Sequence, residues 1–534
     1  MPASSYLTRK TCRRLAAAAL CLLPMATSAA TLNIGVGGEL GSFDPARING
    51  ATWENDVLQD VYEGLVTQDA KGNLIPGVAS DWQISPDGKT YTFTLKEDAR
   101  WSDGTQVSAD DFIYAWRHLL DPSSASSYAY LLYPIMGARD VNAGKLSLEK
   151  LNVKSEAKGR RLVVTLEEPT PYFLRVLAHC IASPLPKQHI AKNGDQWKNM
   201  GQIITNGPFV PVEWVTQSRI RAIKNPAFHD ASQVAFDEVN FYNTENRQSG
   251  IMQFRTKALD IVRDVPSERL GWLKSILPDA VHTTPMLGSY YYAYNQRDGR
   301  PTNDIRVREA LSLATLRNTL ANQVMNSGYQ SATSLIPAGM TDYTPQTLPS
   351  TDAGAKTEER LTLARQKLKD AGFDAQHPLK LTLRYDSSDD NRKVAVALGA
   401  MWQRIGVQTQ LVKAEPNMHH AAMHQGDFDV ARAGWTADYD DALTFLEPLT
   451  STSTNNYGAY NNRHYDELIQ KAIRTLDTHE RRQLLESAEH QAMQDYAVMP
   501  LLAALSRNLI NPALLGYEDN PLDVHLSRWL HPKP

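Results

Sequence analysis

The chain has 534 residues, of which 42% are hydrophobic and 21% charged, and its formal net charge is −4. This length exceeds what a single hydrophobic core supports, so two or three domains are expected. No Lys/Arg-rich run with interleaved aromatic residues is present, which argues against a nucleic-acid partner. No apolar run of about 18 residues lies beyond the N-terminus, so no membrane span is predicted in the body of the chain.

The first thirty residues have the three parts of a secretory signal peptide. Four basic residues precede the apolar run 15–24, and the small residues Ser28 and Ala30 predict cleavage after residue 30. Losing four positive charges and no acid takes the net charge from −4 to −8. Of the three cysteines only Cys180 remains, so no internal disulfide is possible. Cys21 lacks a lipoprotein box, which favours a free product, and Arg13 with Arg14 leaves the twin-arginine route open beside Sec.

Helix and strand patterns alternate along the chain and indicate α/β layers. Alternating apolar and polar residues predict strands at 31–36, 91–96, 161–167, 239–242, 289–295 and 379–385. Helical spacing predicts helices at 304–314, 358–371, 391–405, 465–476 and 479–497. The clearest helix signal follows Ser108, which can form a capping box with Asp111. Asp121 and Pro122 end that helix.

Catalytic motifs are missing from the sequence. It contains no G-x-S-x-G elbow, no H-E-x-x-H, no C-x-x-C and no G-x-x-x-x-G-K-[ST] phosphate loop. We therefore predict that the chain is not an enzyme, needs no cofactor and is not itself an ATPase.

Three of the fourteen histidines lie close together, at His419, His420 and His424. On a helix His420 and His424 would share a face and could bind a transition metal. A partly exposed polar helix without metal is the alternative, and the absence of an acidic or cysteine partner nearby favours it.

Tyrosines gather in two places. Tyr290, Tyr292 and Tyr294 would lie on one face of a strand, and Tyr128 and Tyr130 lie in a loop after the capped helix. They could form ordinary core packing or line a ligand pocket.

The stretch 428–445 begins as a strand and then places Asp438 just past Trp435. A carboxylate beside an indole is costly to bury unless a cation meets it. Asp438 is therefore either a paired structural acid or a counter-charge for a ligand's ammonium group.

Long motifs, in a fixed order, resemble those of one protein family. They are LIPGVASDWQISPDGKTYTFTLKEDARWSDGTQVSADDFIYAWRHLLDP (74–122), PYF (171–173), ITNGPF (204–209), SYYYAYN (289–295), IRVREALS (305–312) and FDVARAGWTADYD (428–440). On these residues the chain resembles the family 5 extracellular solute-binding proteins of ABC importers. The oligopeptide-binding branch and its murein-tripeptide-binding relatives are about equally similar.

The resemblance implies an α/β, bilobal periplasmic-binding-protein fold with three domains and a ligand cleft between the lobes. After a signal peptide at 1–30, domain I would comprise 31–62, 187–287 and 505–534. Domain II would be 63–186, and domain III would be 288–504. Domains I and II would form one lobe, domain III the other, and the lobes would close over the ligand by a hinge.

In the oligopeptide-binding branch the ligand is an extended peptide that pairs with protein backbone on both sides, a form of strand addition. The resemblance implies that Gly434 and Thr436 supply the backbone partners on one side. It implies that Asn49 and Ala51 supply them on the other.

Side chains of the site follow from the same resemblance. Asp438 falls where the family binds the peptide α-ammonium, in a charge-assisted pair. Trp435, Tyr128 and Phe254 fall where the family lines its side-chain pockets. Arg432 matches a basic residue near the ligand.

The chain departs from the family at the other end of the ligand. Peptide binders of this branch carry basic residues that meet the ligand carboxylate, whereas the matching positions hold Met325, Asn391 and Met423. Pro416 replaces a pocket tryptophan. The ligand's length and its carboxyl end are therefore open.

Together these patterns predict a periplasmic substrate-binding protein that captures oligopeptides and delivers them to a membrane permease. The expected partners are the peptide and the inner-membrane ABC permease and ATPase, with the protein itself a monomer. The alternatives are a binder of a murein peptide or another amine-bearing ligand, and a metal or metallophore binder using the three histidines.

Overall fold

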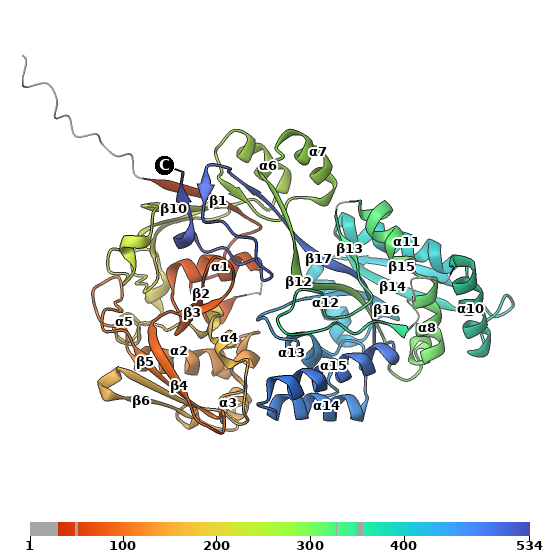
Figure 1. Cartoon of the computed structure of the whole chain (residues 1–534), viewed down its shortest axis with the longest axis horizontal. Coiled ribbons are helices and arrows are strands. Elements are labelled where there is room, and N and C mark those ends of the chain that lie inside the picture. Colours follow the sequence, from red (N-terminus) through yellow and green to blue (C-terminus); the bar gives the residue numbers. More distant parts are fainter. Residues whose placement is uncertain (1–29, 49–51, 327, 350–355, 534) are drawn as a thin grey trace, which may run out of the picture.

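The computed structural model describes residues 30–48, 52–326, 328–349 and 356–533. Figure 1 shows two lobes side by side. The first lobe holds the elements from β1 to α7 and the residues after β17, and the second lobe holds β13 to β16 and the helices from α8 to α15. Two long strands, β12 (Val281–Tyr294) and β17 (Val498–Ile510), run between the lobes.

One mixed sheet extends through both lobes. Its strands in the described part of the chain, in spatial order, are β15 (Gln408–Ala414), β14 (Lys380–Asp386), β16 (Val430–Thr436), β12, β17, β11 (Ile261–Val262), β1 (Thr31–Val36), β10 (Glu238–Asn243), β9 (Arg219–Lys224) and β8 (Phe209–Val215). β13 (Gln330–Ser331) pairs with β17 off this path. Because β12 and β17 contribute to both lobes, they connect the two halves through backbone hydrogen bonds.

The β12–β17 ladder is interrupted at the crossing between the lobes. Regular pairing stops after Pro285 and resumes at Ser289. In the gap a Cβ on Gly288 would lie only 2.6 Å from the Cβ of Ala504, so glycine permits the close approach of the two strands. A broken ladder of this kind bends a strand locally.

Smaller sheets and short helices complete the first lobe. The sheets are β4 (Ala79–Ile84), β5 (Thr90–Leu95), β7 (Arg161–Thr165) and β6 (Val153–Glu156), then β2 (Val66–Gln68) with β3 (Leu74–Pro76), and β18 (Leu514–Leu515) with β19 (His531–Pro532). The helices are α1 (Thr52–Val61), α2 (Ala109–Leu120), α3 (Ala138–Asn142), α4 (Phe173–Leu177), α5 (Lys187–Asn193), α6 (Arg247–Arg255) and α7 (Leu270–Ile276).

The predicted start of α2 is confirmed. Ser108 is its N-cap, and the reciprocal capping box with Asp111 is formed. The apolar face of the helix is buried, and Trp116 Nε1 donates to the carbonyl of Ala182 at 3.0 Å. This bond ties α2 to the segment Cys180–Ala182, and the loop that follows α2 carries Tyr128 and Tyr130.

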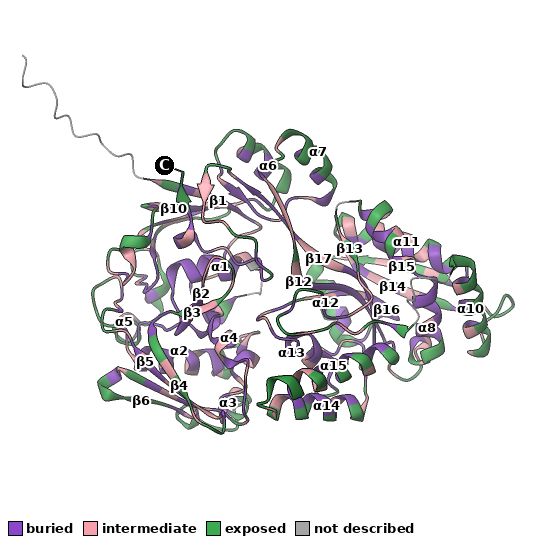
Figure 2. Cartoon of the chain, viewed as in Figure 1, coloured by how far each residue is buried: buried purple, intermediate pink, exposed green. Residues whose placement is uncertain are grey.

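Helices of the second lobe cover its part of the sheet. They are α8 (Ile305–Ala314), α9 (Arg317–Thr319), α10 (Thr357–Asp370), α11 (Asp389–Gln403), α12 (Pro416–Gln425), α13 (Leu443–Leu446), α14 (Arg463–Arg474) and α15 (Thr478–Gln494). Buried positions line β16 and the second half of β12, whereas the edge strand β15 has none and the outer faces of α10 and α14 are exposed (Figure 2). Trp402, fully buried on α11, donates to the carbonyl of Leu311 at 3.1 Å and so ties α11 to α8.

The structure lengthens the strand predicted in β12 and decides between the two alternatives given for its tyrosines. The predicted strand 289–295 is only the second half of a strand that begins at Val281, since Pro285 and the threonines before it obscure the alternation. Tyr290, Tyr292 and Tyr294 are all buried, and the last donates its hydroxyl to the carbonyl of Arg308 at 3.2 Å. These three tyrosines pack in the core.

Candidate functional site

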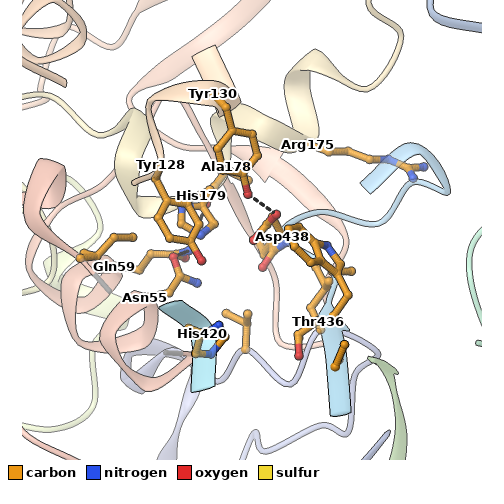
Figure 3. A pocket seen from close by; sticks show the side chains of 18 of the residues that line it. Asn55, Gln59, Tyr128, Tyr130, Arg175, Ala178, His179, His420, Thr436 and Asp438 are labelled. Atoms are coloured by element: carbon orange, nitrogen blue, oxygen red, sulfur yellow. Dashed lines mark hydrogen bonds between the residues drawn. The ribbon is translucent and has the colours of Figure 1, made fainter. Parts of the chain in front are cut away.

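A cavity of about 310 Å³ is lined by residues of both lobes. The first lobe contributes the amides of Asn55 and Gln59 on α1 and the rings of Tyr128, Tyr130 and His179. The second lobe contributes residues 432–438, together with His420 and Met423 of α12. Figure 3 shows the labelled side chains surrounding the hollow, with Tyr130 reaching Asp438.

One edge of β16 has no partner strand along this cavity. β16 pairs with β12 along its whole length, from residue 430 to 436. On its other edge β14 pairs only with Val430 and Ala431, and no other strand in the described ranges pairs with residues 432–436 there. The edge of β16 beyond Arg432 is therefore available to an added strand.

The orientation of that free edge follows from one hydrogen bond. The carbonyl of Arg432 accepts from His419 Nε2 at 2.8 Å, so Arg432 turns its backbone polar groups away from β12. In an antiparallel pair alternate residues direct these groups to the same edge. Gly434 and Thr436 thus present theirs on the free edge, the two positions that the sequence analysis assigns to backbone pairing.

Asp438, just past the end of β16, has no cationic partner within 4 Å among the described residues. Its carboxylate accepts from Tyr130 Oη of the first lobe at 2.8 Å. Burial raises the pKa of Asp438 to about 6, although the Tyr130 and Thr444 hydroxyls oppose the shift. Trp435 Nε1 donates to Thr444 Oγ1 at 3.3 Å and holds this hydroxyl beside the acid. The end of the free strand edge is therefore a negative site without a counter-ion.

Arg432 already has an anionic partner. Its guanidinium lies 3.7 Å from Asp386 and 4.8 Å above the centre of the Tyr290 ring. Burial raises the pKa of Asp386, whereas Arg432 and the amide of Asn391 lower it, and the net shift is downward. Asn391 donates to Asp386 at 2.6 Å and accepts from Tyr290 Oη at 2.7 Å. Asn391 is therefore fully engaged in this network.

The remaining departures from the family pattern are apolar or structural. Met325 and Met423 are both buried, and only Met423 lines the cavity. Pro416 is the first residue of α12, a position that suits its fixed φ. The guanidinium groups that line the cavity are those of Arg432 and Arg175, and Arg175 lies 3.8 Å from Asp440.

Comparison with known proteins identifies the family. The sequence model of the bacterial extracellular solute-binding proteins, family 5 (middle region), matches residues 73–457. The chain belongs to this family. The α/β, two-lobed fold expected from the motifs is confirmed, since solved family 5 structures align with 95% of the chain.

Three family 5 relatives illustrate the range of ligands. The periplasmic oligopeptide-binding protein OppA of Salmonella typhimurium is 38% identical over 502 residues, 91% of this chain and 90% of its own. YgiS of Escherichia coli, a probable deoxycholate-binding periplasmic protein, is 34% identical over 497 residues, 92% of each chain. The solved structure of the murein tripeptide binding protein MppA of Escherichia coli has a TM-score of 0.84 at 33% identity and covers 95% of this chain and 99% of that chain.

The three clustered histidines of this family 5 chain do not converge. His419 is buried, and its Nε2 is used by the carbonyl of Arg432. His420 lines the cavity, whereas the ring of His424 lies edge-on to Tyr457. No group of three potential metal ligands occurs among the residues that the structure describes, so the geometry gives the metal hypothesis no support.

The structure does not bring every predicted site residue to the cavity. Phe254, on α6, packs in a separate core cluster of the first lobe, with Ile251 and Leu259. The resemblance places Phe254 at a side-chain pocket of the ligand site, but in the structure Phe254 packs among apolar core residues and does not line the cavity. Asn49 and Ala51 lie outside the described residues.

The site contains residues that sequence reasoning did not select. Asn55, Gln59 and His179 carry no distinguishing pattern in the sequence. Burial lowers the pKa of His179 to about 4, so its ring is neutral, and it stacks on Tyr128 with 5.6 Å between ring centres. Tyr130 was visible as a loop tyrosine, but its contact with Asp438 spans 308 positions.

Proposed function

We propose that this protein is a periplasmic substrate-binding protein that captures peptides for an ABC importer. The observation that carries the proposal is Asp438, a partly buried carboxylate without a cation, at the end of a free strand edge. A peptide supplies both complements, since its backbone extends the sheet and its α-ammonium neutralises the acid. Both groups are common to all peptides with a free amino terminus, so binding of this kind is independent of sequence.

The charge of the cavity favours an amine-bearing ligand over an anionic one. Arg432 and Arg175 each have a carboxylate partner, whereas Asp438 has no cationic partner within 4 Å in the described structure. A bile acid of the type named for YgiS carries a carboxylate and no amine. Such a ligand would leave Asp438 uncompensated.

Isothermal titration calorimetry with trialanine and N-acetyl-trialanine tests the proposal. We expect the free tripeptide to bind and acetylation to lower the affinity by about 30-fold or more, because it removes the charge that meets Asp438. Equal affinity of the two peptides, or no binding of either, would contradict it.

A cell-wall peptide is the second candidate, supported by the similarity to the murein tripeptide binding protein MppA. Such a peptide also presents a free amine and would use Asp438 in the same way. Native mass spectrometry of protein purified from its own cells separates the candidates by the mass of the co-purified ligand.

The domain division is part of the proposal. We infer that domain I comprises 31–62, 187–287 and 505–534, domain II 63–186 and domain III 288–504. The boundaries at 287 and 504 fall inside β12 and β17, close to where their ladder is interrupted. A hinge at this crossing would move the lobes with little loss of pairing.

Localisation and partners follow from the family. We propose export by a cleavable signal peptide at 1–30, a free periplasmic monomer, and delivery of the ligand to inner-membrane permease and ATPase subunits. Curated relatives are periplasmic binding proteins. Within the described ranges, every helix is too short or too polar to cross a membrane.

Tyr130→Phe should weaken peptide binding about tenfold. The hydroxyl donates to Asp438 at 2.8 Å, and a hydrogen bond to a charged group contributes about 1.5–3 kcal/mol. Calorimetry with trialanine measures the loss. Tyr460→Phe is the matched control, since Tyr460 donates to Asp495 at 2.6 Å outside the cavity. Equal affinities of the Tyr130→Phe variant and wild type would contradict the role given to this hydroxyl.

Peptide affinity should be highest between about pH 6 and pH 8. The pKa of Asp438 in the free protein is raised to about 6, so at lower pH the ligand must displace a proton and the affinity falls by up to tenfold per unit. Above about pH 8 the peptide amine itself loses its charge. Titrations from pH 5 to pH 9 measure the profile. A peptide affinity that stays constant from pH 7 down to pH 5 would contradict pairing with an ionised Asp438.

A further inference from the structure

A second cavity, of about 580 Å³, adjoins the first at Asp438. The two cavities share Tyr130, Trp435 and Asp438. The first is lined by β16 and α12, which precede Asp438 in the chain. The second is lined by residues that follow it, on α13, on the loop 450–455 and on α14, and by the loop 126–134 of the first lobe. We call this second cavity the amino-side chamber.

In the proposed binding mode, only one part of the ligand can occupy the amino-side chamber. A peptide whose α-ammonium meets Asp438 and whose backbone follows the edge of β16 toward Arg432 extends through the first cavity. Of such a peptide, only the side chain of the first residue can enter the chamber beyond Asp438. The chamber is the larger of the two, so it has room for a long side chain.

Charged groups make the chamber acidic. Its carboxylates belong to Glu167, Glu168, Asp438 and Glu447, against the single guanidinium of Arg139. Glu168 is paired with cations outside the lining, at 3.1 and 3.3 Å, and Glu167 accepts a backbone N–H at 2.9 Å. These two acids are therefore already satisfied.

Glu447 is different, because its carboxylate has no hydrogen bond and no ion pair within 4 Å among the described residues. Burial raises its pKa, and only the more distant Arg139 opposes the shift. The Arg139 guanidinium lies instead over the ring of Tyr133, 4.6 Å from its centre. Glu447 is thus a second acid, after Asp438, that lacks a counter-charge.

Part of the chamber wall is apolar. Leu131, Tyr172 and Val176 of the first lobe face Ile469 and Ile473 of α14 across the chamber. Such walls suit an aliphatic stem, and the free carboxylate suits a cation at its end.

We propose that the amino-side chamber binds a cationic side chain of the ligand's first residue, lysine or arginine in class, with Glu447 as its counter-charge. The inference rests on the proposed function and adds a specificity to it. Peptides with a basic first residue bind by two ammonium or guanidinium contacts, one at Asp438 and one at Glu447. A charge at the second position does not reach the chamber.

Calorimetry at pH 7.5 with paired tripeptides tests this. Lys-Ala-Ala and norleucine-Ala-Ala have the same aliphatic stem and differ in the terminal charge. We expect the lysine peptide to bind about tenfold more tightly to the wild-type protein, and the ratio of affinities to fall to about one in Glu447→Gln. Ala-Lys-Ala and Ala-norleucine-Ala should give the same ratio in both proteins.

Glu467→Gln is the matched control, since Glu467 is a half-exposed acid on α14 that pairs with Arg463 at the surface. It should keep the wild-type ratio. Binding of norleucine-Ala-Ala to Glu447→Gln shows that this variant folds. Equal binding of the first pair by wild type, or a preference that survives Glu447→Gln, overturns this inference while peptide binding stands. Failure of wild type to bind any of the peptides overturns the proposed function as well.

Discussion

Asp438→Asn should lower the affinity for trialanine by about 30-fold or more at pH 7.5. Removing one partner of a desolvated charge pair costs about 2–5 kcal/mol, and each 1.4 kcal/mol is a factor of ten. Asparagine keeps the size of the side chain and can still accept from Tyr130, so the loss reports the charge. The ligand-free variant should be at least as stable as wild type to heat, because a partly buried, unpaired carboxylate is removed.

A double-mutant cycle makes this result specific. The protein change is Asp438→Asn and the ligand change is N-acetylation, and each should remove the same contact. Once one change is made, the other should cost little. Asp427→Asn, at an exposed acid paired with Arg384, should behave as wild type. Full additivity of the two changes would place the peptide amine away from Asp438.

Arg481→Met should destabilise the second lobe by about 3–5 kcal/mol. Arg481 and Asp441 form a two-point ion pair with N–O distances of 2.7 and 2.8 Å, and about nine-tenths of each side chain is buried. Methionine fills part of the space but leaves Asp441 charged without a partner. Urea unfolding followed by circular dichroism measures the shift in the transition.

A second substitution separates the charge from the packing. Adding Asp441→Asn to Arg481→Met removes the orphaned charge and keeps an acceptor for the N–H of Leu443, now 3.0 Å from Asp441. The double variant should recover at least half of the lost stability. Arg463→Met, at a surface pair with 92% of the arginine side chain exposed, should cost less than about 0.5 kcal/mol. A double variant as unstable as Arg481→Met would assign the loss to packing.

Local sequence signals predicted the elements that depend on neighbouring residues. The Ser108–Asp111 box spans three positions and fixes the start of α2. β1 occupies the predicted residues 31–36, because alternation is a property of the strand itself. The first half of β12 was missed, because Pro285 breaks that alternation and the strand is held there by β17, more than two hundred positions away.

Most of the predicted site residues that line the cavity belong to the second lobe, and Tyr128 is the one of them in the described chain that comes from the first lobe. Asp438, Trp435, Gly434 and Thr436 lie in one short segment, so a single motif located them together. The opposite wall comes from α1 and from the loops around residues 128 and 179, which only the fold brings to β16. No sequence pattern indicated Glu447 either, because its lack of an ion-pair or hydrogen-bond partner depends on the residues that surround it in the chamber.

The hydrogen bond between Tyr130 and Asp438 joins the two lobes through the group that the ligand is expected to neutralise. When the lobes meet without a ligand, the phenol donates a hydrogen bond to the acid but supplies no charge, so closure without a ligand leaves a partly buried anion without a counter-charge. This cost favours the open form of the ligand-free protein. An amine-bearing ligand supplies the missing charge and removes the cost of closure. An importer that recognises only the closed form would thus hydrolyse little ATP on ligand-free protein.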